Sequence, residues 1–321
     1  MHELKTRRVK VNDVELSVVD EGDGYPVVLC HGFPELSYSW RHQVPALVDA
    51  GYRVIVPDQR GYGRSSRPSE ITDYDIVHLR GDLLALLDEI GAPKAVFVGH
   101  DWGSIITWSM STRCPERMAA VVGMSVPFIP RADAPPIASM KQAFGDTFFY
   151  MVYFQEPGVA DADLGADPAK TMTRFLAGMS SDDPDAAARM FAPYGEMGMV
   201  DRMPEPKGLP DWLTQAELDH YIEEFTHCGF FGPVSWYRNM DRNWALDADL
   251  AGAKVTIPSL FITGGSDPVR MMVPESAMDG WLTDHRGSHI VEGAGHWVQQ
   301  EKPAEVNAAL LGFLGGLDLS S

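Results

Sequence analysis

Short apolar runs that alternate with helix-like segments are the feature of this sequence that most limits how it can fold. The runs cover residues 26–31, 52–58, 95–99 and 119–124. The segments with helical spacing between them cover residues 40–48, 76–90 and 103–113. A strand that is apolar along its whole length is typically buried on both faces, as in a parallel sheet. The alternation therefore predicts an α/β fold, with a mostly parallel central sheet flanked by helices.

This rhythm stops after Pro127 and returns more than a hundred residues later. Residues 130–245 hold helix-like pieces divided by proline and glycine, with no apolar run of the earlier type. Strand-like runs resume at 257–264 and 288–291, and a closing helix is expected at 303–314. The pattern indicates that one α/β domain is interrupted by a mostly helical insertion.

The predicted domains follow from this interruption. Residues 1–129 and 246–321 form the α/β core, which begins with two alternating strands within residues 6–20, and residues 130–245 form a helical lid. The net charge of the chain is −19, and residues 131–240 carry −9 of it together with 9 of the 16 methionines. This local change in composition supports an insertion with a different role.

The charge and cysteine content bound the partners and the compartment. A net charge of −19 disfavours nucleic acid and anionic membranes as partners. No stretch reaches the ~20 apolar residues of a membrane span, and the N-terminus has no signal-peptide core. Three cysteines without a CxxC pair suggest neither a disulfide framework nor a zinc site. We expect a soluble cytoplasmic protein, monomeric or homodimeric.

The segment 99–103, Gly-His-Asp-Trp-Gly, follows a predicted strand and opens a predicted helix. This is the spacing of a nucleophile elbow, with Asp101 where many hydrolases have serine. Glycines permit the sharp turn, which exposes the central side chain at the carboxyl edge of the sheet. The neighbouring helix N-terminus favours the anionic form of Asp101. We interpret Asp101 as a nucleophile.

Three further segments end at the same edge of the predicted sheet. His31-Gly32-Phe33-Pro34 follows an early strand, where a backbone donor for an oxyanion is needed. Asp267 follows residues 257–264, and His296 follows the last strand. The order nucleophile, acid and histidine is that of α/β-hydrolases. The spacing predicts a catalytic Asp101–Asp267–His296 constellation.

These motifs resemble the α/β-hydrolase superfamily and, within it, the soluble epoxide hydrolases. The matching segments cover nearly the whole chain and lie at residues 31–34, 39–41, 61–63, 99–103, 153–158, 236–240 and 295–297. The first and fourth also resemble haloalkane dehalogenases. The segments at 153–158 and 236–240, in the insertion, are the specific ones.

The resemblance implies hydrolysis of an epoxide to a vicinal diol through a covalent ester on Asp101, with water activated by the His296–Asp267 pair. Two lid tyrosines act as general acids in this family. They correspond here to Tyr150 and Tyr237, and the motif alignment favours Tyr150 over the nearby Tyr153.

The resemblance also implies an oxyanion hole and a substrate pocket. The backbone N–H groups of Phe33 and Trp102 would form the oxyanion hole. The predicted pocket residues are His31, Pro34, Met151, Gln155 and Trp297. The substrates are a small hydrophobic epoxide and water, and the reaction needs no metal and no organic cofactor.

Two alternatives remain at this point. A haloalkane or haloacid dehalogenase could use the same Asp101 and His296, but Phe33 offers no side-chain donor to a halide and two lid tyrosines would have no role. A non-catalytic ligand sensor would normally lack part of the triad. The sequence leaves open which epoxide is used, its regio- and enantioselectivity, and the physiological role.

Overall fold

The chain forms two compact units. The computed structural model describes residues 4–180, 189–190, 192–195 and 197–319. The first unit consists of Met1–Arg60, Leu79–Pro130 and Leu250–Ser321, and the second of Gly61–His78 and Arg131–Asp249.

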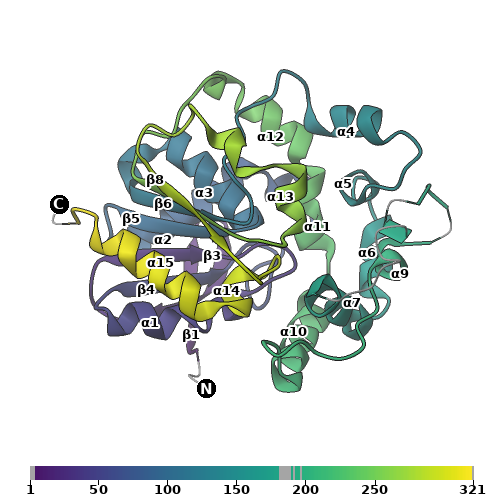
Figure 1. The fold of residues 1–321 in the computed structure, drawn as a ribbon, viewed down its shortest axis with the longest axis horizontal. Helices are drawn as coiled ribbons and strands as arrows, with labels where there is room; N and C mark the ends of the chain where they lie inside the picture. The colour runs from purple at the N-terminus through teal and green to yellow at the C-terminus, as the bar shows by residue number, and fades with distance from the viewer. Residues whose placement is uncertain (1–3, 181–188, 191, 196, 320–321) are drawn as a thin grey trace. The chain divides into compact units, whose positions relative to one another are not determined.

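The first unit is built on one eight-stranded sheet (Figure 1). Its strands are β1 (Thr6–Val11), β2 (Val14–Glu21), β3 (Pro26–Cys30), β4 (Arg53–Asp58), β5 (Ala95–His100), β6 (Met118–Met124), β7 (Ser259–Gly264) and β8 (His285–Val291). Their order across the sheet is β1-β2-β4-β3-β5-β6-β7-β8. The hairpin of β1 and β2 joins β4 in antiparallel pairing, and the other pairs are parallel. The predicted, mostly parallel sheet is confirmed.

Helices flank this sheet and come mainly from the segments between strands. They are α1 (Gln43–Asp49), α2 (Ile76–Glu89), α3 (Trp102–Arg113), α13 (Pro268–Met272), α14 (Val298–Glu301) and α15 (Pro303–Gly315). Short 3₁₀ helices lie at η1 (Ser37–Trp40), η3 (Pro115–Arg117), η5 (Ala248–Leu250) and η6 (Glu275–Met278). The first turn of α2 falls in the second unit, and η5 spans the boundary.

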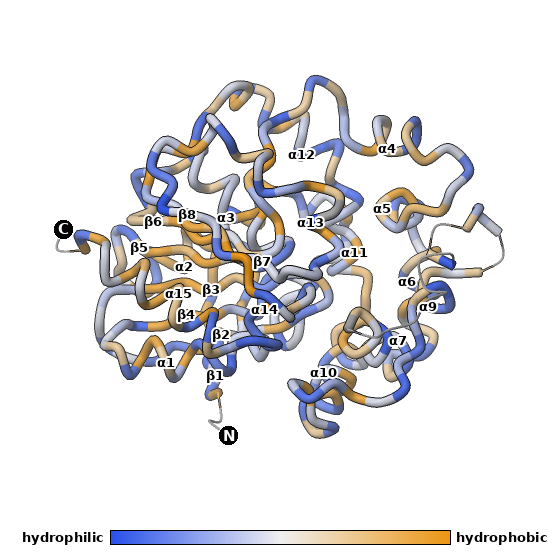
Figure 2. The backbone as a smooth tube through the Cα atoms, in the orientation of Figure 1, coloured by the Kyte–Doolittle hydropathy of each residue, from blue (hydrophilic) through white to orange (hydrophobic). Residues whose placement is uncertain are grey.

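One hydrophobic cluster of the first unit lies on the sheet face that α1 and α15 cover. Alternate strand residues such as Val27 and Leu29 are fully buried there, together with Leu310 of α15. Figure 1 shows α1 and α15 side by side, and Figure 2 shows that the inner strands are the hydrophobic part of this unit. α3 packs on β5 and β6, and β5 is buried along its whole length and β6 at every residue except Ala119. Such burial explains their continuous apolar character.

The second unit is helical in its described part. Its helices are α4 (Pro136–Phe144), α5 (Tyr150–Tyr153), α6 (Val159–Gly165), α7 (Pro168–Leu176), α9 (Met199–Arg202), α10 (Gln215–Cys228), α11 (Phe231–Arg238) and α12 (Met240–Leu246), with the 3₁₀ helices η2 (Ile71–Tyr74) and η4 (Gly178–Ser180). Within the described residues its β pairing is limited to an isolated bridge between Thr147 and Pro193.

Residues 61–78 belong to this second unit, although the predicted boundary placed them in the core. Gly61 and Gly232 approach so closely that a Cβ on Gly232 would lie 2.7 Å from the Cα of Gly61. Nε of Arg64 donates to Oε1 of Glu224 at 2.9 Å. The sequence pattern does not reveal this grouping, because the contacts join positions about 160 residues apart.

Candidate active site

The turn between β5 and α3 carries Asp101 in an unusual backbone conformation. Asp101 has φ 51° and ψ −118° and stands at the N-cap position of α3. Non-glycine residues rarely adopt positive φ, and such strain is found mostly at functional sites. A Cβ on Gly103 would lie 2.0 Å from the carbonyl oxygen of Cys30, so only glycine permits this close approach. The local geometry is that expected for a nucleophile elbow.

Backbone donors hold the Asp101 carboxyl. The N–H of Phe33 donates to Oδ1 at 2.8 Å, and the N–H of Trp102 also hydrogen-bonds to this carboxyl. Gly32 allows the approach, since a Cβ there would lie 2.4 Å from the Cβ of Asp101. The structure thus brings together the predicted nucleophile and both predicted oxyanion donors. Burial raises the pKa of Asp101 above its ordinary value, although His296 and the two backbone donors act against the increase.

His296 and Asp267 come from the loops after β8 and β7. Nδ1 of His296 lies 3.0 Å from Oδ1 of Asp267, and its Nε2 lies 3.9 Å from Oδ2 of Asp101. Burial lowers the pKa of His296, but Asp267 and Asp101 raise it more, to about 9. For Asp267 the directions are opposite. Burial alone would raise its pKa, but the positive charge of His296 lowers the pKa below the ordinary value. The imidazole is therefore oriented by one carboxylate and directed toward the other.

The second unit brings Tyr150 of α5 and Tyr237 of α11 together. Their ring centroids are 5.8 Å apart, and the ring of Phe154 contacts both tyrosines. The hydroxyl of Tyr153 donates instead to Oδ2 of Asp163 at 3.2 Å. Burial and the charge of Asp163 raise the pKa of Tyr153. This arrangement favours Tyr150 over Tyr153 as the partner of Tyr237.

Three predicted pocket residues of the first unit, His31, Pro34 and Trp297, are buried. His31 is 0 % exposed; its Nε2 accepts a hydrogen bond from the N–H of Gln59, and its Nδ1 lies 3.0 Å from the carbonyl oxygen of Gly32. Pro34 is buried and follows a cis peptide bond. The ring of Trp297 packs on that of His296 at 4.6 Å. His31 is thus placed to hold the loop, which differs from its predicted position in the wall of the pocket.

The other two predicted pocket residues, Met151 and Gln155, lie in the second unit and are half-buried. Nε2 of Gln155 donates to the carbonyl oxygen of Met151 at 2.7 Å and to that of Tyr237 at 3.1 Å. The amide therefore links two stretches of backbone.

Comparisons with known proteins identify the family of this chain. The family model of the alpha/beta hydrolase fold matches residues 25–303. Epoxide hydrolase A of Mycobacterium tuberculosis (strain ATCC 25618 / H37Rv) is 54 % identical over 316 residues, 98 % of each chain. The chain belongs to the epoxide hydrolases of the α/β-hydrolase superfamily.

Solved structures support the same assignment. Epoxide hydrolase A from Mycobacterium thermoresistibile is 56 % identical, with a TM-score of 0.94, over 98 % of this chain and 99 % of that one. An epoxide hydrolase from an endophytic Streptomyces is 40 % identical, with a TM-score of 0.93, over 97 % of this chain and 95 % of that one. The predicted fold and the predicted enzyme class, an epoxide hydrolase acting on an epoxide and water, are confirmed.

A buried pair near the elbow of this epoxide hydrolase, Glu35 and His100, is not among the predicted site residues. Nδ1 of His100 lies 2.5 Å from Oε2 of Glu35, and its Nε2 lies 2.8 Å from the carbonyl oxygen of His296. Glu35 also accepts from the N–H of Gly32 at 3.2 Å. Burial raises the pKa of Glu35, but His100 lowers it more, to about 2. The only signal in the sequence is an acid just after the segment 31–34.

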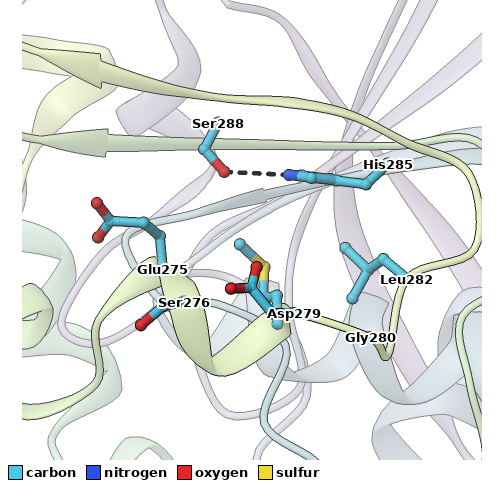
Figure 3. A pocket seen from close by; sticks show the side chains of 8 residues that line it. Glu275, Ser276, Asp279, Gly280, Leu282, His285 and Ser288 are labelled. Carbon is cyan, nitrogen blue, oxygen red and sulfur yellow. Dashed lines mark hydrogen bonds between the residues drawn. The ribbon is translucent and has the colours of Figure 1, made fainter.

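The first unit of the epoxide hydrolase also contains a surface pocket of about 360 Å³ (Figure 3). It is lined by Glu275, Ser276, Met278, Asp279, Gly280, Leu282, His285 and Ser288. Figure 3 shows the hydrogen bond of 3.1 Å between Nε2 of His285 and Oγ of Ser288 on one wall. Neither Asp101 nor His296 lines this pocket, so it is separate from the predicted catalytic residues.

None of the helices in the described part of this epoxide hydrolase combines the length and the apolar character that a membrane span requires.

Proposed function

We propose that this epoxide hydrolase works through a covalent ester on Asp101. The observation that carries the proposal is the unequal treatment of the two Asp101 oxygens. Oδ1 accepts the Phe33 N–H at 2.8 Å, whereas Oδ2 is the oxygen nearest to His296, at 3.9 Å. Oδ2 is then the attacking atom, and Oδ1 becomes the ester carbonyl oxygen at a site that already has donors.

In the first step, Oδ2 of Asp101 attacks one carbon of the epoxide and the carbon–oxygen bond of the ring breaks. The ring oxygen becomes a strong base, which takes a proton from a tyrosine hydroxyl. Tyr150 and Tyr237 are the proposed donors, and general acids of this kind typically contribute 10²–10⁴-fold to the rate. Support comes from their adjacent rings in the second unit, which we propose to be the lid.

In the second step, His296 takes a proton from water, and the resulting hydroxide attacks Cγ of the ester. The negative charge develops on Oδ1, where the N–H groups of Phe33 and Trp102 stabilise it. The bond between Cγ and Oδ2 then breaks, and the diol leaves after taking the proton from His296. The second proton of the water returns to the tyrosine through solvent. Asp101 retains one oxygen of the water.

The negative charge of Asp101 controls when His296 can act as a base. In the free enzyme, Asp101 is among the groups that raise the pKa of His296 to about 9, which favours imidazolium at neutral pH. Esterification removes the negative charge of Asp101. The pKa of His296 then falls, so the neutral imidazole needed as a base forms when the ester is ready for hydrolysis.

Trapping of the ester tests this proposal. His296→Gln should allow the first step and block the second, so that intact mass spectrometry detects protein plus one molecule of styrene oxide. Asp101→Asn is the matched control and should form no adduct. If His296→Gln forms no adduct under saturating epoxide, the covalent route is wrong.

A substrate comparison addresses the dehalogenase alternative. We expect diol from styrene oxide and no halide from a haloalkane of similar size. Halide release without diol would overturn the proposed function.

We further propose a cytoplasmic location. Within the described residues, Cys30, Cys114 and Cys228 form no disulfide, which is typical of proteins in a reducing compartment. Cell fractionation tests this proposal, and recovery with secreted or membrane fractions would contradict it.

A further inference from the structure

The two tyrosine helices of the second unit are linked through Arg238. This arginine directly follows Tyr237 at the end of α11. Its Nε donates to the carbonyl oxygen of Phe154 at 2.9 Å, and Nη2 donates to that of Glu156 at 3.3 Å. Phe154 caps the C-terminus of α5, the single turn that carries Tyr150. Arg238, which is next to Tyr237 in the chain, therefore binds the C-terminal end of α5, the helix that carries Tyr150.

Asp161 of α6 fixes this guanidinium. Nη1 of Arg238 lies 3.1 Å from Oδ1 of Asp161, and Nη2 lies 2.5 Å from Oδ2. The Arg238 side chain is 2 % exposed and that of Asp161 is 18 % exposed, so water competes little with the pair. Oδ2 of Asp161 also accepts the N–H of Gly158 at the start of α6. A bidentate pair of this kind is strong and geometrically specific.

Gln155 provides a second link between the same helices. Through its Nε2 it joins the carbonyl oxygen of Met151, which follows Tyr150, to that of Tyr237. Phe154 fills the space between the tyrosines, with ring centroids 5.7 Å from Tyr150 and 5.0 Å from Tyr237. The separation of the two phenols is thus set by backbone links on one side and a shared aromatic contact on the other.

We propose that Arg238, held by Asp161, is a positioning residue that sets the geometry of Tyr150 and Tyr237 and thereby the rate of epoxide opening. The proposal rests on the proposed function, in which these tyrosines protonate the ring oxygen. Opening requires both hydroxyls to reach one oxygen atom. A displacement of about 1 Å can cost about 10²-fold in such a geometry.

The rate constants of the two chemical steps distinguish a positioning role of Arg238 from a role in folding alone. Hydrolysis of the ester uses Asp101, His296 and Asp267, all of which lie in the first unit. Loss of correct tyrosine geometry slows only the opening step. A general loss of folded enzyme lowers the active fraction in both steps equally and leaves both rate constants unchanged.

The experiment measures both rate constants in single turnovers of styrene oxide with enzyme in excess, by quenched-flow and intact mass. For Arg238→Met we expect opening to slow by about 10- to 100-fold, with ester hydrolysis within about 2-fold of the wild type. Arg238→Lys keeps the charge but cannot bridge Asp161 and both carbonyls. Its rate constant for opening should therefore lie between those of the wild type and Arg238→Met.

Arg174→Met is the matched control. Arg174 lies in α7 of the same unit and donates to the carbonyl oxygen of Val200 at 2.6 Å and to Glu205 at 3.2 Å. Neither partner belongs to a tyrosine helix. The control should leave both steps unchanged, and circular dichroism should show all variants folded.

A double-mutant cycle tests the role of Asp161. Asp161→Asn should slow opening, and its effect should largely vanish in the Arg238→Met background, because the two act as a unit. Equal slowing of both steps, or no slowing of opening, would overturn the role of Arg238. Absence of any covalent ester in the wild type would instead overturn the proposed function itself.

Discussion

Nε2 of His296 lies 3.9 Å from Oδ2 of Asp101, while Oδ1 of the same carboxylate accepts the N–H of Phe33 at 2.8 Å. The distance to the imidazole is too long for a hydrogen bond. The contact between Oδ2 and His296 is therefore an attraction between charges, and Oδ2 is the oxygen on the imidazole side. This difference between the two oxygens underlies the first prediction.

A single turnover in heavy-oxygen water should place the label on Asp101 and leave the diol unlabelled. The reason is that Oδ2 departs with the product, and an oxygen from water replaces it. Mass spectrometry of the diol and of the peptide that contains Asp101 measures the outcome. Label in the diol of the first turnover would mean that water attacks the epoxide directly.

Removal of either lid hydroxyl should slow epoxide opening. Tyr150→Phe and Tyr237→Phe are each expected to reduce the opening rate constant by about 10²-fold, since each deletes one of the two proposed proton donors. Tyr153→Phe is the control, because the hydroxyl of Tyr153 bonds to Asp163. A larger effect at Tyr153 than at Tyr150 would reverse the assignment.

The stability of the folded protein should fall as His296 loses its proton. Its pKa is raised to about 9 in the folded state, above the unfolded value of about 6.5. The stabilisation is therefore complete below about pH 6.5 and is lost as the pH rises through about 9. It amounts to at most about 3 kcal/mol.

Urea unfolding of the wild type and of His296→Gln at pH 6 and pH 10 measures this effect. The variant has no group that titrates at this position, so the wild type should lose its advantage over the variant at the higher pH. A stability difference that is independent of pH would contradict the raised pKa of His296.

Gly103→Ala should disrupt the elbow. The added Cβ would lie 2.0 Å from a backbone oxygen of β3, so either α3 or β3 must move. We expect a loss of about 3 kcal/mol or more in the free energy of unfolding, with loss of activity. Gly312→Ala is the control, because a Cβ there meets open space within α15 and should gain up to about 1 kcal/mol. Equal stability of both variants would show that the close approach is not needed.

The elbow could be predicted from the sequence because its constraints are local. Gly99 and Gly103 flank Asp101 within one turn, and an apolar run precedes them. The choice between Tyr150 and Tyr153 was different, since helical spacing allowed both side chains to approach a site. Only the family motif favours Tyr150, and the hydrogen bond from the hydroxyl of Tyr153 to Asp163 supports this assignment.

Long-range contacts account for what the sequence did not reveal. His31 is held by Gln59, which is far along the chain and lies on a different strand connection. Residues 61–78 join the second unit through partners such as Glu224 and Gly232. No spacing rule links such positions, because only the folded backbone brings them together.

β6 and β7 pair directly, although residues 125–258 lie between them in the chain. The two ends of this long segment therefore leave from neighbouring strands, which are about 4.8 Å apart in any sheet. Exchange of this segment among relatives, together with residues 61–78 that contact it, is thus a practical route to enzymes that accept other epoxides while the residues proposed to hydrolyse the ester stay unchanged.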